Sequence, residues 1–69
     1  MPLTMADYGK ALFIKGIHGR DETRRFLASL GFVPGAKVTV VTEMGGNMIL
    51  NVKETRIALN KGMASRIMV

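Results

Sequence analysis

The sequence has no cysteine, no tryptophan and only one histidine among its 69 residues. Without cysteine there is no disulfide, no cysteine-based zinc site, no iron–sulfur cluster and no thiol nucleophile. One histidine and five acidic residues are also too few to predict a structural metal site with several ligands. Small domains often depend on disulfides or zinc for stability, so this chain must rely on its hydrophobic core.

The motifs of common enzymes are missing as well. His18 is the only histidine and lies in a glycine-rich loop, with no serine–histidine–aspartate set around it. No glycine loop ends in Gly-Lys-Ser or Gly-Lys-Thr, so we do not expect the chain to hydrolyse GTP by itself. The sequence therefore predicts a protein that is not an enzyme.

Membrane-targeting signals are also lacking. No apolar run reaches the roughly 18 residues that a transmembrane helix needs. The segment Met1–Asp7 has neither the basic region nor the continuous apolar region of a signal peptide. We expect a cytoplasmic protein without direct membrane insertion.

The composition is that of one small folded domain, residues 1–69. Apolar residues make up 48% of the chain, which is usual for a globular protein. Eight glycines divide the sequence into short segments, as is typical of a β-rich fold. A chain of this length buries only about 60% of the surface that it exposes when unfolded, so we expect modest stability.

Alternation of apolar and polar residues predicts five strands, over residues 11–17, 36–43, 48–53, 56–60 and 66–69. Met48 is expected in the core and Met5 is expected to pack back as an N-terminal anchor. One further turn of helix is predicted over residues 61–65. Five short strands favour a small β-barrel, because closure removes exposed strand edges.

One main helix is predicted from Asp21 to Leu30, between the first and second strands. Acidic residues at its start complement the helix dipole, and Gly31 stands where a left-handed cap is expected. Phe26, Leu27 and Leu30 form an apolar stripe that should pack against the sheet and cap one end of the barrel.

A Leu-Gly-x-x-Pro-Gly pattern stands at residues 30–35, and further short segments stand in a fixed order from Leu3 to Val69. Through the order and spacing of all these segments, the chain resembles the FeoA family, small cytoplasmic accessory proteins of bacterial ferrous-iron uptake. The turn Lys53-Glu54-Thr55 lacks the glycine that is common in the family, and Tyr8 stands where proline is frequent. The other matching segments are Gly9-Lys10-Ala11, Ile14–Ile17, Arg25–Ser29, Ile57-Ala58-Leu59, Ala64, Ile67 and Val69.

This resemblance implies an SH3-like β-barrel and an accessory role. The implied partner is the large membrane ferrous-iron transporter, which carries a cytoplasmic GTP-binding domain. Similar domains are appended to iron-dependent repressors, but no helix-turn-helix accompanies this one. No cofactor is required by the implied role.

The net charge of +5 comes from ten Lys and Arg residues against five Asp and Glu residues. Such a charge suits an acidic partner, although an even spread of basic residues is also usual for a solvated surface. Only Arg20, Arg24 and Arg25 cluster. A solvated helix face is the first interpretation of these arginines, docking to an acidic partner is the second, and an arginine supplied to a GTPase is the third.

A second candidate for partner binding is the predicted hairpin turn, Met44-Gly45-Gly46-Asn47. An apolar side chain at a glycine-containing tip is hard to explain as core, so Met44 is a candidate contact point. The hypothesis is that this tip and the basic helix face form the partner surface.

His18, Asp21 and Glu22 are weak candidates for an N/O site that binds Fe²⁺ or Zn²⁺. The simpler interpretation is a solvated loop in which the two carboxylates begin the helix.

Nucleic-acid binding by a basic small barrel is the alternative function. It is not the expected one, because Tyr8, Phe13, Phe26 and Phe32 do not form a spaced stacking ladder on one strand face. A steep salt dependence of binding would support this alternative.

Overall fold

The computed structural model describes all 69 residues and contains six strands and one main helix. The helices and the 3-10 turn are η1 (Leu3–Met5), α1 (Asp21–Ser29) and α2 (Lys61–Ala64). The strands are β1 (Ala11–Phe13), β2 (Gly16–Ile17), β3 (Lys37–Met44), β4 (Asn47–Val52), β5 (Thr55–Asn60) and β6 (Ile67–Met68). The prediction of a mainly β fold with one main helix is confirmed. The helix was predicted between the first and second strands and lies between β2 and β3, because the predicted first strand is divided into β1 and β2.

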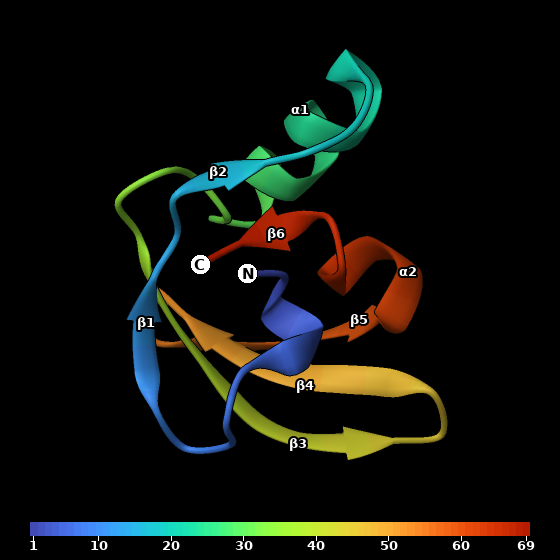
Figure 1. Cartoon of the computed structure of the whole chain (residues 1–69). Coiled ribbons are helices and arrows are strands. Elements are labelled where there is room, and N and C mark those ends of the chain that lie inside the picture. The colour runs from blue at the N-terminus through green and yellow to red at the C-terminus, as the bar shows by residue number, and fades with distance from the viewer.

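The strands form two antiparallel sheets. Four of them lie in the order β1-β3-β4-β5, and β2 pairs with β6 in a separate two-stranded sheet. Figure 1 shows the larger sheet in the lower part of the molecule, the β2–β6 pair above it and α1 above that pair. The main helix is therefore next to the small sheet, at one end of the molecule.

The predicted closed barrel and the continuous first strand are both wrong in detail. The chain leaves β1 at Ile14, whose N–H donates to the Ala36 carbonyl at 2.9 Å and whose carbonyl accepts from the Gly35 N–H at 2.8 Å. After this bend the chain enters the second sheet as β2. Because the ladder is interrupted here and the outer edge of β5 has no neighbour, the strands do not close into one barrel.

The core lies between the sheets and is entirely apolar. No polar or charged residue is buried. Alternate residues of β3 and β4 face the core as the sequence pattern predicts, and Met48 is buried among them. The pairing of β3 with β4 shifts between Val40 and Thr42, so Val41 is an extra residue that bends the strand. The core consists of Leu3, Ala6, Ile14, Leu27, Phe32, Val38, Val40, Met48, Leu50, Val52, Leu59, Ala64, Ile67 and Val69.

The apolar stripe of α1 is narrower than predicted. Leu27 is fully buried, but Phe26 is 49% exposed, so its assignment to the core is wrong. Gly31 ends the helix with φ +104° and donates to the Ala28 carbonyl, while the Phe32 N–H donates to the Leu27 carbonyl, both at 3.0 Å. This Schellman arrangement turns the chain inward, so Phe32 fills the core position that was expected of Phe26.

Both ends of the chain are tied to the small sheet. The Met1 ammonium donates to the Val69 carbonyl and the Val69 N–H donates to the Met1 carbonyl, each at 2.8 Å. Pro2 forms a bridge with Met68, and Figure 1 shows the two ends side by side. The N-terminal anchor is Leu3, which is fully buried, and the prediction for Met5 is wrong because Met5 is 70% exposed.

Two tight turns join the strands of the central meander. Gly45 and Gly46 connect β3 to β4 with φ values of +57° and +82°. Lys53 and Glu54 connect β4 to β5 with similar values, +49° and +62°, although neither residue is a glycine. The second turn therefore places two ordinary side chains in the left-handed region of the backbone.

Candidate functional site

A surface groove with a volume of about 360 Å³ lies between the small sheet and the main helix. Arg24 is the only charged residue in its wall. The groove can therefore accept an apolar group beside a negatively charged one. Its lining consists of Gly16, Ile17, Arg24, Ala28, Phe32, Val33 and Pro34.

Three local features of the sequence build this groove. The bend at Ile14 sends Gly16 and Ile17 into β2, which forms one wall. Arg24 and Ala28 stand four residues apart on α1 and therefore share a face of the helix. The Gly31 cap turns the chain back, which brings residues 32–34 in as the third wall.

The predicted basic cluster lies at the same end of the molecule as the groove. Arg20 precedes the first residue of α1 and its side chain does not cap the helix. Arg24 forms an exposed ion pair with Asp21, and Arg25 is exposed. An exposed pair of this kind contributes about 0–1 kcal/mol, so Arg24 can exchange Asp21 for another carboxylate at little cost.

Sequence analysis did not place Arg66 in this cluster. A Cβ atom added to Gly19 would lie 3.4 Å from the Arg66 Nη1 atom, so this guanidinium lies over the loop before α1. The pairing of β2 with β6 brings it there, since the His18 N–H donates to the Arg66 carbonyl at 2.8 Å. The only signal in the sequence was a basic residue at the start of the predicted last strand, residues 66–69.

The three weak metal candidates do not form a site. No three His, Asp or Glu side chains come together in a group that could hold a metal ion. His18 and Glu22 are exposed, and Asp21 is paired with Arg24 instead. The structure therefore provides no centre in which these side chains act together on a metal.

The predicted partner surface is divided between two ends of the molecule. Figure 1 shows the β3–β4 turn, which contains Gly45 and Gly46, far from α1. The two candidate regions therefore do not form one continuous patch, and their role as a partner surface stays a prediction. Met44 is 65% exposed, as expected for a contact point.

The hairpin tip is held by α2. The Lys61 N–H donates to the Gly46 carbonyl at 3.3 Å, and Lys61 Nζ lies 2.9 Å from Glu43 Oε1. The hydrogen bond and the charge of Glu43 raise the pKa of Lys61, with a smaller contribution in the same direction from Tyr8. Both side chains of the pair stay partly exposed, so the tip is fastened at the surface.

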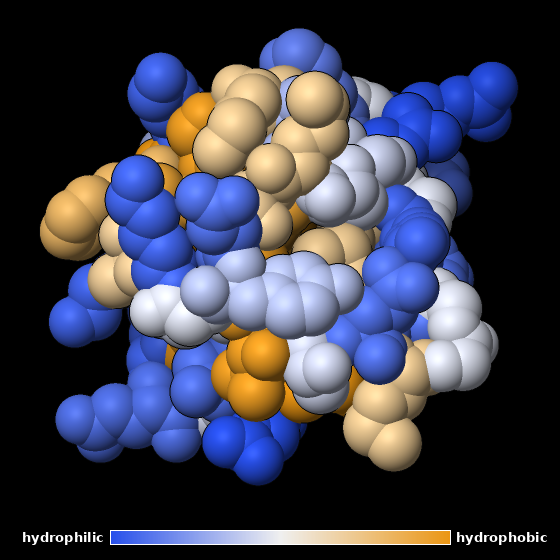
Figure 2. Space-filling model, turned by 60° about the horizontal axis from the view of Figure 1, so that its bottom comes forward, coloured by the Kyte–Doolittle hydropathy of each residue, from blue (hydrophilic) through white to orange (hydrophobic).

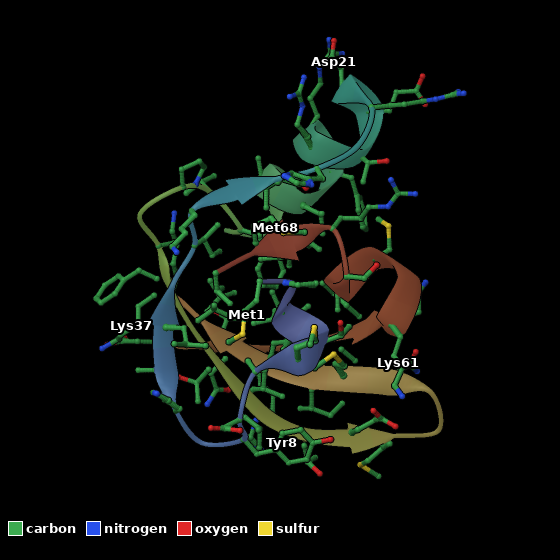
Figure 3. All side chains as sticks on the ribbon, in the orientation of Figure 1. Met1, Tyr8, Asp21, Lys37, Lys61 and Met68 are labelled. Carbon is green, nitrogen blue, oxygen red and sulfur yellow. The ribbon has the colours of Figure 1, made fainter.

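The face around Tyr8 is mixed in character. Tyr8, labelled at the bottom of Figure 3, is 57% exposed. Figure 2 shows this side of the molecule, where apolar atoms reach the surface in separate places among hydrophilic ones. It has no groove, since the one pocket of the structure is at the other end, beside α1.

None of the helices combines the length and the apolar character needed to cross a membrane.

Comparison with known proteins gives a consistent result. The model of the FeoA domain matches residues 1–69. A Methanocaldococcus jannaschii protein that bears the name Fe(2+) transport protein A is 32% identical over 68 residues. These residues are 99% of this chain and 83% of that protein.

Solved structures agree with the sequence comparison. A crystal structure of an iron uptake regulatory protein (FeoA) is 31% identical, with a TM-score of 0.88 over 97% of this chain and 91% of that one. Stenotrophomonas maltophilia FeoA, solved in complex with zinc and described as a procaryotic SH3 domain protein, is 29% identical, with a TM-score of 0.86 over 100% of this chain and 88% of that one. The expected SH3-like fold is therefore confirmed.

Proposed function

Since this chain belongs to the FeoA family, which is associated with ferrous-iron transport, we propose that it is a non-enzymatic accessory protein of ferrous-iron uptake. In this role it binds the cytoplasmic part of the membrane ferrous-iron transporter, which carries a GTP-binding domain, and modulates assembly or activity of the transporter. The single observation that carries the proposal is the match of the whole chain, residues 1–69, to the FeoA domain. The description of the Stenotrophomonas maltophilia protein as a candidate activating factor of ferrous iron transport supports it.

We assign the transporter contact to the end of the molecule that carries α1. Arg20, Arg24 and Arg25 are exposed there, and guanidinium groups recognise carboxylates through paired hydrogen bonds. The groove beside these arginines adds apolar surface to the contact. We assign the Met44–Asn47 tip, at the other end of the molecule, to a second contact with the same partner.

The proposed role requires no metal. The zinc of the Stenotrophomonas maltophilia complex is a property of that protein. In this chain the residues do not fit a metal centre, because His18, Asp21 and Glu22 are not gathered into one group. Each could bind a divalent ion only weakly, as a single ligand.

The test is an affinity capture from detergent-solubilised membranes of the source cell at near-physiological salt. The charge-reversed variant Arg24→Glu/Arg25→Glu is compared with the native chain and with Lys10→Glu/Lys37→Glu, which changes the net charge equally at two exposed positions outside α1. We expect the native chain and the control to recover the transporter and the arginine variant to lose it. Equal recovery by all three would remove α1 from the contact.

Nucleic-acid binding stays the alternative, because the net charge is +5 and Arg66 joins the arginines near α1. Its signature is binding that falls steeply as salt is raised, whereas a protein contact built partly on apolar surface tolerates salt. Capture of nucleic acid with the transporter absent would put this function first.

A further inference from the structure

The strand β2 has a backbone edge without a partner. Gly16 pairs with Met68 and Ile17 with Ile67, and the His18 N–H donates to the Arg66 carbonyl at 2.8 Å. In an antiparallel pair the backbone groups of alternate residues point to the partner strand. Because the His18 N–H points to β6, the N–H and C=O groups of the preceding residue, Ile17, point the other way. The Lys15 N–H also donates to the Met68 carbonyl, at 2.7 Å, so the regular alternation ends before the paired residues Gly16 and Ile17.

No other part of the chain takes up these two groups. The hydrogen bonds made outside the regular elements include none to Ile17, and β2 has no neighbour other than β6. Figure 1 shows that the side of β2 away from β6 faces α1. Ile17 and Gly16 also line the groove, so the unpaired edge borders an open space.

Other strand edges lack this combination. β1 and β5 are the outer strands of the larger sheet, and neither contributes a residue to the groove. β6 is covered on its other side by the N-terminal segment, through the Pro2–Met68 bridge. Only the edge of β2 combines the unpaired backbone groups of Ile17 with apolar side chains such as Val33 and with the guanidinium of Arg24.

The charge near the groove favours an acidic occupant. Arg24 lies in the wall, and the segment from residue 15 to residue 34 carries four cations, Lys15, Arg20, Arg24 and Arg25, against two carboxylates, Asp21 and Glu22, a net of +2. A helix would not suit the edge, since its own backbone groups are already bonded internally. An extended segment has free groups at the spacing that a strand edge requires.

We propose that the groove binds an extended peptide segment of a partner protein, which adds to β2 by exchanging backbone hydrogen bonds with Ile17. One apolar side chain of the segment packs on Val33 and Pro34, which line the groove and are not buried, and an acidic side chain pairs with Arg24. This inference rests on the proposed function only for the identity of the partner, the ferrous-iron transporter.

Gly16 makes a clean blocking variant possible. A Cβ atom at Gly16 would meet nothing within 4 Å, and its φ lies outside the left-handed region, so we expect Gly16→Val to add bulk at the groove while the protein stays folded. Ala11→Val is the matched control, because Ala11 is an exposed strand residue of β1 outside the groove. Thermal unfolding of both variants confirms that they stay folded.

The first experiment uses NMR with an acetylated and amidated hexapeptide of alternating valine and glutamate. We expect the Ile17 amide to exchange rapidly in the free protein and at least tenfold more slowly with saturating peptide. The His18 amide, already bonded to Arg66, is the internal reference. A peptide of alternating valine and lysine should bind at least tenfold more weakly, and Gly16→Val should bind the acidic peptide at least tenfold more weakly than Ala11→Val does.

The proposal is overturned if the acidic peptide leaves the Ile17 amide unprotected, or if Gly16→Val binds it as Ala11→Val does. Protection of Ile17 in the free protein that grows with protein concentration would also overturn it, since the occupant would then be a second copy of this chain.

The membrane capture separates the two proposals. Recovery of the transporter by the native chain and Ala11→Val, but not by Gly16→Val, supports both. Equal recovery by all three keeps the proposed function and rejects the groove. Groove binding of the acidic peptide without recovery of the transporter by the native chain keeps the groove and rejects the proposed partner.

Discussion

Replacing Glu54 with glycine should stabilise this protein. Glu54 is the second central residue of the β4–β5 turn and has a φ of +62°, in the left-handed region. Its side chain is exposed and takes no part in an ion pair, so its removal loses no contact that the structure holds. Lys53 is left unchanged, because its Cδ would lie 3.3 Å from a Cβ atom at Gly31 and its stem therefore covers that residue.

The size of the effect follows from two opposing costs. A residue with a Cβ atom loses about 1–2 kcal/mol in the left-handed region. Glycine loses about 0.5–1 kcal/mol more conformational entropy than alanine on folding. The difference predicts a gain of about 0.5–1 kcal/mol for Glu54→Gly, which in a domain of this size corresponds to a rise of about 2–8 °C in Tm.

Urea and thermal unfolding followed by far-UV circular dichroism measure the change, since the chain has no tryptophan. The matched control is Gly46→Ala in the β3–β4 turn. Its φ is +82° and a Cβ atom there would meet nothing within 4 Å, so the same two backbone costs change in the opposite direction and no contact changes. We expect this control to lose about 1 kcal/mol. A Glu54→Gly protein no more stable than the native one, beside a destabilised Gly46→Ala protein, would refute the reasoning.

Three further outcomes are expected. Gly31→Ala should lose about 1–2 kcal/mol in urea unfolding, because φ is +104° and the added Cβ would crowd the Lys53 side chain at 3.3 Å; an unchanged midpoint would contradict the Schellman cap. Leu27→Ala should lose about 2–5 kcal/mol and Phe26→Ala well under half as much, since only Leu27 is buried; equal losses in the same assay would contradict the packing of α1. The raised pKa of Lys61 means that its pair with Glu43 stabilises the fold fully below pH 10.5, the ordinary value, and that this contribution is lost as pH rises through the higher folded pKa. The difference in the free energy of unfolding between the native chain and Lys61→Gln should therefore be constant from pH 7 to 10 and shrink at higher pH. If this difference did not change with pH up to 11.5, the Lys61–Glu43 pair would not be the cause of the stability that the substitution removes.

The elements whose signal is local were predictable from the sequence. β4 has an apolar residue at every second position, and all three of these residues, including the predicted core residue Met48, are buried. The Gly31 cap and the Gly45-Gly46 turn depend on backbone conformations that glycine adopts readily, so their place in the sequence was enough.

Features that depend on distant parts of the chain were not predictable in this way. At Ile14 the chain passes from one sheet to the other: Ile14 is bonded to Gly35 and Ala36, and Lys15 is bonded to Met68, all more than twenty residues away. Residue spacing on a helix cannot decide whether Phe26 or Phe32 fills the core, because both are apolar and both lie close to the Gly31 cap. The packing of distant segments places Phe32 in the core and leaves Phe26 partly exposed.

The candidate site shows the same division. The arginines of α1 were found because they cluster in the sequence. The groove was not found, because its walls come from three segments that only the β2–β6 pairing and the Gly31 cap bring together. The separation of the hairpin tip from α1 likewise required the spatial arrangement.

The mutual hydrogen bonds of Met1 and Val69 make the order of the elements along the chain partly interchangeable. A short glycine-rich linker could join the two ends, and the chain could be opened instead between Gly45 and Gly46, at an exposed turn. Such a circular permutant would keep every strand pairing while moving its new ends to the face opposite α1. Affinity tags for the capture experiments could then be attached at the Gly45-Gly46 turn, far from the groove, so that loss of capture would test the hairpin tip separately from the groove.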